Sequence, residues 1–166
     1  NDTLVEGNET ATVTPSGDTL NNQVTFTAGV LTIDDADSAT LSIAATTVNE
    51  DGGAQSIVVT LNTFDSGVAG GATLATGVTL TADVTDAGGG SATSGIDSTA
   101  LGTQQVTFTA GDGDNTMSVA QAQITPTNDA LIEGNETVNV AFIGQRQHAG
   151  WSGVAGHRVR CSHHRR

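Results

Sequence analysis

The sequence predicts an all-β protein whose strands pack as an antiparallel β-sandwich. Apolar and polar residues alternate with a period of two in six segments between residues 38 and 144, a pattern typical of half-buried strands. Clusters of Asp, Asn and Gly separate these segments, as they do in turns. No segment shows a sustained helical stripe, and none has the run of ~20 apolar residues that a membrane-spanning helix needs. Short strands at this spacing favour a sandwich over a parallel sheet.

The predicted strands follow one another along the chain and are rich in threonine, as expected for the solvent face of a sheet. Two are expected before an acidic junction at residues 34–37, namely Thr10–Thr14 and Val24–Ile33. Six are expected after it, namely Thr40–Ala44, Gln55–Leu61, Val78–Val84, Val106–Ala110, Met117–Ile124 and Thr137–Ile143. Since the chain has no tyrosine, one tryptophan and four phenylalanines, the core must be built from Val, Ile, Leu and Ala.

Charged residues are distributed very unevenly. All 18 acidic residues lie between Asp2 and Glu136, the chain has no lysine, and its five arginines all follow residue 145. Residues 1–145 therefore carry 18 negative charges and no Lys or Arg, which excludes nucleic-acid binding by this part and disfavours contact with anionic membranes. Such a charge density destabilises a compact fold unless a cation binds, so a metal ion is the natural candidate. The single cysteine, Cys161, excludes an internal disulfide framework.

An internal repeat organises the chain. The ten residues Asn1–Thr10 recur at Asn128–Thr137 with eight identities, at an offset of 127 residues that matches the size of one domain. We therefore expect residues 1–37 to be the last two strands and acidic junction of one repeat unit. Residues 38–144 would form a second unit that lacks its last strand, and residues 145–166 a basic tail. Because the chain starts without methionine and inside a repeat, it is expected to be a fragment of a longer protein.

The repeated Asn-Asp-x-Leu-x-Glu-Gly-Asn-Glu-Thr motif resembles the Calx-beta repeat of sodium–calcium exchangers and bacterial surface proteins. Residues 48–53, followed by an alternating strand, and the opening strand after the Asp-Asp-x-Asp junction fit the same family. Residues 81–97 resemble its Asp-Gly-Thr and Gly-x-Asp segment, with a Gly-rich insertion at residues 88–90. The resemblance covers residues 1 to about 144 and implies an immunoglobulin-like β-sandwich in which loop carboxylates at one end bind calcium in some members.

The resemblance also implies two sets of calcium ligands. For the second unit these are Glu50, Asp86, Asn128, Asp129, Glu133 and Glu136. For the preceding unit they are Asp2, Glu6, Glu9, Asp34, Asp35 and Asp37. Asn128 stands where calcium-binding members often have a carboxylate, so it would offer only a neutral amide oxygen.

The chemistry of these residues supports calcium independently. Calcium takes six to eight oxygen ligands in flexible geometry, and carboxylates three and four residues apart on a loop can converge on one cation. Residues 1–145 contain no histidine or cysteine, which argues against zinc or copper. The alternative interpretation is that the acids cap strands, form turns and keep the surface soluble. The acidic segment 112–115 is expected to be a hairpin turn.

The tail differs in composition from the rest of the chain. Residues 145–166 hold every arginine and histidine, the only tryptophan and the only cysteine. Their histidines and Cys161 lack regular ligand spacing and are not expected to form a site. Shifting the reading frame by one base would permit a sequence resembling residues 30–34, so the tail is interpreted as an out-of-frame translation of the closing strand; a basic tail or foreign sequence is the alternative. Either way we expect it to be disordered, and Val24–Ile33 to pair with the open edge in the same chain or in a neighbouring molecule.

These observations predict a non-enzymatic, calcium-binding structural or adhesion module of a large extracellular or cell-surface repeat protein of bacterial origin. Its partners would be calcium ions, neighbouring repeats of the same protein, and cell-surface or matrix ligands. Calcium would rigidify the junctions between units by neutralising their clustered carboxylates. The alternatives are a metal-independent spacer or adhesion and carbohydrate-binding surface, and an accessory domain of a secreted hydrolase. The predicted strands and loops carry no recognisable Ser/His/Asp or paired-carboxylate arrangement of catalytic residues.

Overall fold

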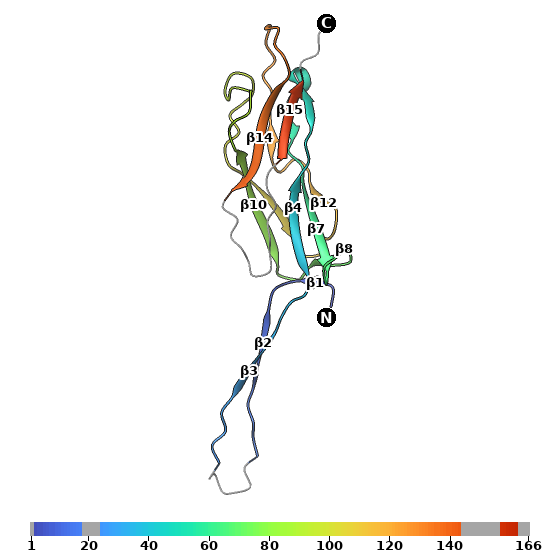
Figure 1. Ribbon diagram of the computed structural model, residues 1–166, viewed down its shortest axis with the longest axis vertical. Helices are drawn as coiled ribbons and strands as arrows, with labels where there is room; N and C mark the ends of the chain where they lie inside the picture. The colour runs from blue at the N-terminus through green and yellow to red at the C-terminus, as the bar shows by residue number, and fades with distance from the viewer. Residues whose placement is uncertain (1, 18–23, 144–156, 163–166) are drawn as a thin grey trace.

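A computed structural model describes residues 2–17, 24–143 and 157–162 and confirms the all-β prediction. Figure 1 shows an elongated molecule in which a β-sandwich carries a long hairpin that extends from one end. The described residues contain one short 3₁₀ turn, η1 (Glu50–Gly52), and no α-helix. No helix in this part of the chain is long and apolar enough to cross a membrane.

Two sheets form the sandwich. The first has the strand order β11 (Gln104–Thr109), β10 (Thr79–Asp86), β14 (Glu136–Ile143), β15 (His157–Ser162) and β5 (Thr47–Asn49). Its neighbouring strands are antiparallel except for β15 and β5, which run parallel. The second sheet has the order β12 (Thr116–Ser118), β7 (Val59–Asp65) and β4 (Ser38–Ile43), with β8 (Val68–Ala69) paired to β7.

Three short pairs complete the fold. β6 (Gln55–Ser56) pairs antiparallel with β13 (Gln123–Ile124), and β1 (Leu4–Val5) pairs parallel with β9 (Thr73–Leu74). The projecting hairpin consists of β2 (Glu9–Val13) and β3 (Gly29–Ile33), which are antiparallel. Since β1 immediately precedes this hairpin, the β1–β9 pair attaches the hairpin's base to the sandwich.

The core lies between the two sheets, where the inward residues of each strand alternate with outward polar ones. Leu41 and Leu61 from one sheet and Val84, Val106 and Phe108 from the other are almost completely buried. Fully burying a side chain of this kind contributes about 1.5–3 kcal/mol, so this layer supplies most of the driving force for folding. As predicted, the buried apolar residues of the described part are Val, Ile, Leu and Ala, with Phe108 as the one aromatic exception.

Three local predictions are wrong because the chain changes sheets where the alternation pattern continues. Residues 55–61 and 117–124 were each expected to form one strand, but β6 and β13 pair apart from β7 and β12. In the second case the break falls near Ala120, which has a left-handed φ of 61°. The segment 112–115 is not a hairpin turn, because it connects β11 in one sheet to β12 in the other.

The structure also corrects the prediction for the tail. His157–Ser162 form β15, which lies between β14 and β5, so the sheet is not open at this position. The expectation that the second unit lacks a closing strand, and that the whole tail is disordered, is therefore wrong for these six residues. The remaining predicted tail residues lie outside the described part of the chain. Nor does β3 pair with the sandwich edge in the same chain, since its described partner is β2.

Candidate metal centre

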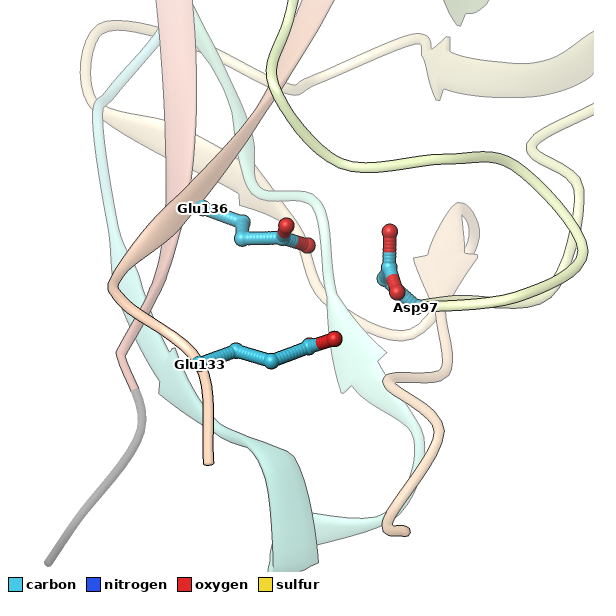
Figure 2. A group of neighbouring side chains, drawn as sticks. All are labelled: Asp97, Glu133 and Glu136. Carbon is cyan, nitrogen blue, oxygen red and sulfur yellow. The ribbon is translucent and has the colours of Figure 1, made fainter. Parts of the chain in front are cut away.

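Three carboxylates from two distant segments converge at one end of the sandwich. Oxygen atoms of Asp97, Glu133 and Glu136 all lie within 4.8 Å of one another. Figure 2 shows the carboxylates of Asp97 and Glu136 facing each other, with Glu133 reaching toward the same space from below. Three negative charges this close repel one another strongly unless a cation or protons compensate them.

The repeated motif contains two of these three carboxylates. Glu136 is the first residue of β14, and Glu133 lies three residues earlier in the loop that leads into the strand. This loop belongs to the motif that is present twice in the chain. The pairing of Glu136 with Cys161 in β15 fixes the backbone at Glu136, while the loop lets Glu133 turn back toward it.

Asp97 reaches the group because the chain after β10 continues to follow β14. The N–H of Ala87 donates to the carbonyl oxygen of Asn139 at 2.7 Å, and the N–H of Ala92 donates to that of Thr137 at 3.1 Å. Between them, a Cβ atom on Gly90 would lie 2.1 Å from the Thr137 carbonyl oxygen, so only glycine permits this approach. The Gly-rich insertion thus lets the loop run along β14 toward Glu136.

Local hydrogen bonds then hold Asp97 in place. Its Oδ2 accepts a hydrogen bond from the N–H of Thr93, and its own N–H donates to the Thr93 carbonyl at 2.9 Å. The N–H of Thr127 donates to the Asp97 carbonyl oxygen at 3.0 Å. The last contact ties the Asp97 loop to the segment just before the acidic motif, which brings the two parts of the group together.

A hydrogen bond joins two more of the predicted ligands, Glu50 and Asp129. The N–H of Asp129 donates to Oε1 of Glu50 at 2.9 Å, and Glu50 opens the turn η1 that follows β5. Asp129 in turn accepts a hydrogen bond from the N–H of Leu131 through Oδ1 at 2.7 Å. The two carboxylates therefore shape the acidic loop, and Asn128 lies exposed beside Asp129 in the same loop.

Asp86 is placed differently from the rest of its predicted set. It ends β10 opposite Val140, four residues along β14 from Glu136, a separation of roughly 13 Å at the usual rise of a strand. Its Oδ1 accepts a hydrogen bond from the N–H of Gly88 at 2.8 Å and so caps the turn after the strand. The structure does not bring Asp86 into the group of Asp97, Glu133 and Glu136.

Sequence reasoning did not choose Asp97 as a ligand, although a signal for it was present. Residues Gly95-Ile96-Asp97 form the Gly-x-Asp piece of the motif resemblance. Asp86 was the predicted ligand because it matches the loop aspartate in the middle of the family's domain, whereas Asp97 lies in an irregular loop with no hydropathy pattern. Only the pairing of that loop with β14 shows that it comes close to Glu136.

The predicted acids of the preceding unit gather at the base of the hairpin. Asp35 is the centre of this group, because its Oδ2 accepts hydrogen bonds from the N–H groups of Glu6 and Gly7, each at 3.0 Å. Beside it, the side-chain amide of Asn8 donates to Oδ1 of Asp34 at 2.7 Å. An open hollow of about 280 Å³ is lined by residues 6–9 of this loop.

At this junction the pKa values of two neighbouring carboxyls, Asp35 and Glu6, shift in opposite directions. Burial alone would raise the pKa of Asp35, but hydrogen bonds from the backbone N–H groups of Glu6, Asp37 and Gly7 lower it below the usual value. Burial raises the pKa of Glu6, and the negative charges of Glu9, Asp2, Asp35 and Asp37 raise it further. Glu6 is thus held in a negative environment that a cation would relieve.

Asp37 joins this junction to the body of the sandwich. Its side chain is only 4% exposed, and its Oδ1 accepts a hydrogen bond from the N–H of Ser66 at 3.0 Å. Its Oδ2 is buried without a hydrogen-bond partner among the described residues. Burying a carboxylate oxygen in this way is costly unless an ion or solvent satisfies it.

The donor set of both groups fits a hard cation. The acidic side chains of both groups offer oxygen ligands, and histidine and cysteine are absent from residues 1–145.

Comparison with known proteins supports the fold. No protein-family model matches the sequence, and no curated protein matches it. Among solved structures, the apo form of the Calx CBD1 domain superposes with a TM-score of 0.53 at 14% identity, over 77% of this chain and 99% of that one. CBD12 from CALX1.2 superposes with a TM-score of 0.54 at 15% identity, over 75% of this chain and 44% of that one. The calcium binding domain CBD12 of CALX1.1 gives a TM-score of 0.51 at 15% identity, also over 75% and 44%.

This likeness agrees with the all-β architecture of the sandwich. At this identity it establishes the arrangement of strands and not the ligand. The chain therefore has a Calx-beta-like β-sandwich fold.

Proposed function

We propose that this chain is a non-enzymatic calcium-binding module of a repeat protein. The observation that carries the proposal is the convergence of Asp97, Glu133 and Glu136 at one end of the sandwich. The similar structures support it, since one of them is a calcium binding domain. Glu50 and Asp129 lie in the adjoining turn and loop and would add further oxygen ligands.

Calcium fits this centre better than other biological cations. Magnesium prefers near-ideal octahedral geometry and keeps several waters, whereas calcium accepts irregular sets of six to eight oxygens. The centre offers carboxylates on two loops and a strand end, which together form a flexible, charged and irregular set. Calcium would also compensate part of the negative charge of residues 1–145, which hold no lysine or arginine.

We further propose that calcium stiffens the junction between repeat units. The junction acids already connect the hairpin to the sandwich, through Asp35 to the loop of Glu6 and through Asp37 to Ser66. A cation bound among these carboxylates would stabilise that arrangement by removing their mutual repulsion. The proposed role is that of a spacer or adhesin segment in an extracellular or cell-surface protein, with neighbouring repeats as its partners.

Thermal unfolding tests this proposal. Because a ligand that binds only the folded form stabilises it by about 2.7 kcal/mol at 100 times its Kd, calcium should raise the Tm by roughly 5–10 °C. The double variant Glu133→Gln and Glu136→Gln should lose most of this rise. Asp83→Asn is the matched control, because it removes a negative charge on β10 at a position opposite Ile143, away from the centre.

An identical Tm in calcium and in EDTA for the unaltered chain would favour the metal-independent spacer. In that case the carboxylates would act only as turn caps, as Asp129 does for Leu131 and Asp86 does for Gly88. If Asp83→Asn lost as much of the calcium-induced rise in Tm as the double variant, calcium would be acting on the overall charge and not at a site.

A further inference from the structure

We propose that Leu131–Ile132 form a docking strand, which adds to the sheet edge of the unit that follows in a repeat array, as β1 adds to β9 in this chain. This role rests on the proposed function in a repeat protein, but it does not require calcium. The motif of residues 1–10 and its copy at residues 128–137 differ in one respect. The apolar pair of the first copy is paired with a sandwich, and that of the second copy is exposed.

The first copy of the motif shows what such a strand binds. The N–H of Thr73 in β9 donates to the carbonyl oxygen of Thr3 at 2.9 Å, and the N–H of Ala75 donates to that of Val5 at 3.2 Å. The side chain of Val5 packs against the hydrophobic core. Since β1 precedes the acidic junction at residues 34–37 and β9 follows it, this contact joins two of the predicted units.

Both copies of the motif begin with the same turn. The N–H of Leu4 donates to Oδ1 of Asp2 at 3.1 Å, and the N–H of Leu131 donates to Oδ1 of Asp129 at 2.7 Å. An Asp side chain that binds the backbone two residues further on forms such a turn from local sequence alone. No strand of the described residues includes Leu131–Ile132, so the turn that leads into this segment does not depend on strand pairing.

The apolar side chains of the second copy are uncovered. Leu131 is 61% exposed and Ile132 is 93% exposed, whereas their counterparts Leu4 and Val5 are half-buried. An extended segment of this kind adds to a sheet edge through main-chain hydrogen bonds, and pockets for its side chains give specificity. The occupant that fits this segment is therefore an edge like β9, which binds the same motif in this chain.

The partner is a following unit and not a second free copy of this chain. The β9 edge of a second copy already carries that copy's own β1. A unit that begins at its acidic junction has no such strand of its own, so its β9 edge depends on the motif of the preceding unit. Figure 1 shows the orange loop that leads into β14 at the end of the sandwich opposite β1, so units joined in this way would follow one another end to end.

The acidic junction completes the contact in the first copy. Oδ2 of Asp35 accepts hydrogen bonds from the N–H groups of Glu6 and Gly7, each at 3.0 Å, directly after β1. Residues of β15 stand 128 positions after their register counterparts in β3, so the counterpart of Asp35 is His163. The second copy of the motif therefore has no equivalent carboxylate here, and an experiment on the docking strand must restore it.

A tandem chain tests the docking strand. Residues 1–161 followed directly by residues 34–166 restore the acidic junction and add a second sandwich body that has no β1 of its own. With Cys161→Ser in both parts, Leu131→Cys should form a disulfide with Thr73→Cys of the second body, because Leu4 pairs with Thr73. Under mild oxidation in EDTA, this disulfide should protect both thiols from alkylation.

Two matched pairs calibrate the crosslink. Leu4→Cys with Thr73→Cys in the single chain gives the yield of two positions that are directly paired. In the tandem, Gln105→Cys on the outer strand β11 of the second body replaces Thr73→Cys and should give no crosslink.

The exposed isoleucine gives an independent measurement. In the tandem, Ile132→Ser in the first body should lower the Tm by roughly 2–6 °C, as Val5→Ser should in the single chain. In the single chain, Ile132→Ser should leave the Tm unchanged, because this side chain is 93% exposed. Val119→Ser is the matched control, since Val119 is an apolar residue that is 67% exposed, and it should change the Tm of neither chain.

Three outcomes would overturn the docking strand. They are a crosslink to position 73 of the second body no stronger than that to position 105, an unchanged Tm for Ile132→Ser in the tandem, and an equal loss of Tm for this variant in the single chain. Calcium titration of the same tandem separates this role from calcium binding. A tandem that crosslinks but binds no calcium would contradict only the proposed calcium binding, whereas one that binds calcium without crosslinking would contradict only the docking strand.

Discussion

The backbone N–H of Asp129 donates a hydrogen bond to Oε1 of Glu50, although 79 residues separate them in the sequence. This contact links the turn after β5 to the acidic loop before β14. It fixes the position of the loop that carries Glu133. The turn η1 is thereby connected to the candidate metal centre. A carboxylate in this place therefore has a structural role as well as a proposed ligand role, and substitutions can separate the two.

Replacing Glu50 distinguishes those roles. Glu50→Gln retains an oxygen that can accept the hydrogen bond from Asp129, whereas Glu50→Ala removes it. We expect Glu50→Ala to lower the free energy of unfolding in EDTA by about 0.5–1.5 kcal/mol, the usual net value of such a bond, and Glu50→Gln to lower it less. Both variants should reduce the stabilisation by calcium. Urea unfolding with and without calcium measures both effects, and equal losses in EDTA would contradict the structural role.

The approach of the loop to β14 depends on a glycine. A Cβ atom on Gly90 would lie 2.1 Å from the carbonyl oxygen of Thr137, so Gly90→Ala must displace the loop that carries Asp97. We expect a loss of about 1–3 kcal/mol in unfolding free energy, typical of overpacking, together with weaker calcium stabilisation. Gly102→Ala is the matched control, because no atom lies within 4 Å of the added carbon. If the two variants behave alike, the loop does not follow β14 as described.

The junction carboxyls predict opposite dependences on pH in EDTA. The raised pKa of Glu6 means that its ionisation is unfavourable in the folded state, so its contribution is present at low pH and is lost as pH rises through that pKa. Glu6→Gln should therefore be more stable than the unaltered chain near neutral pH and equal to it in acid. Urea unfolding across the acidic range measures this difference.

The sign is reversed for Asp35, whose pKa is lowered by three backbone N–H groups. Its contribution is present above the usual pKa of aspartate and is lost as pH falls through the lowered value. Asp35→Asn should be less stable than the unaltered chain near neutral pH, with the difference shrinking in acid. Parallel pH profiles for the Glu6 and Asp35 variants would contradict the described junction.

Much of the fold could be predicted because the alternation of apolar and polar residues along a strand indicates which side chains are buried. The strand containing Leu41 and the strand containing Val138 and Val140 bury the residues that the pattern marks. What the pattern does not encode is a change of sheet, because a residue on an inward face looks the same in either layer. The breaks between β6 and β7 and between β12 and β13 were missed for this reason.

The candidate centre was predictable in part for a similar reason. Glu133 and Glu136 belong to a repeated motif and lie next to a strand, so their proximity follows from local sequence. Asp97 comes close to them only through the pairing of residues 87–92 with β14, a contact across more than 40 residues that no local pattern specifies. The strand β15 was missed because residues 157–162 lack the composition of the other strands.

A calorimetric titration of calcium into the metal-free chain tests the central claim most directly. The account predicts saturable binding that the triple variant Asp97→Asn, Glu133→Gln and Glu136→Gln loses or weakens at least tenfold, a factor that corresponds to about 1.4 kcal/mol. Asp83→Asn should bind as the unaltered chain does. Absence of saturable binding, or equal affinity in the triple variant, would contradict the assignment of this group of carboxylates as a calcium site.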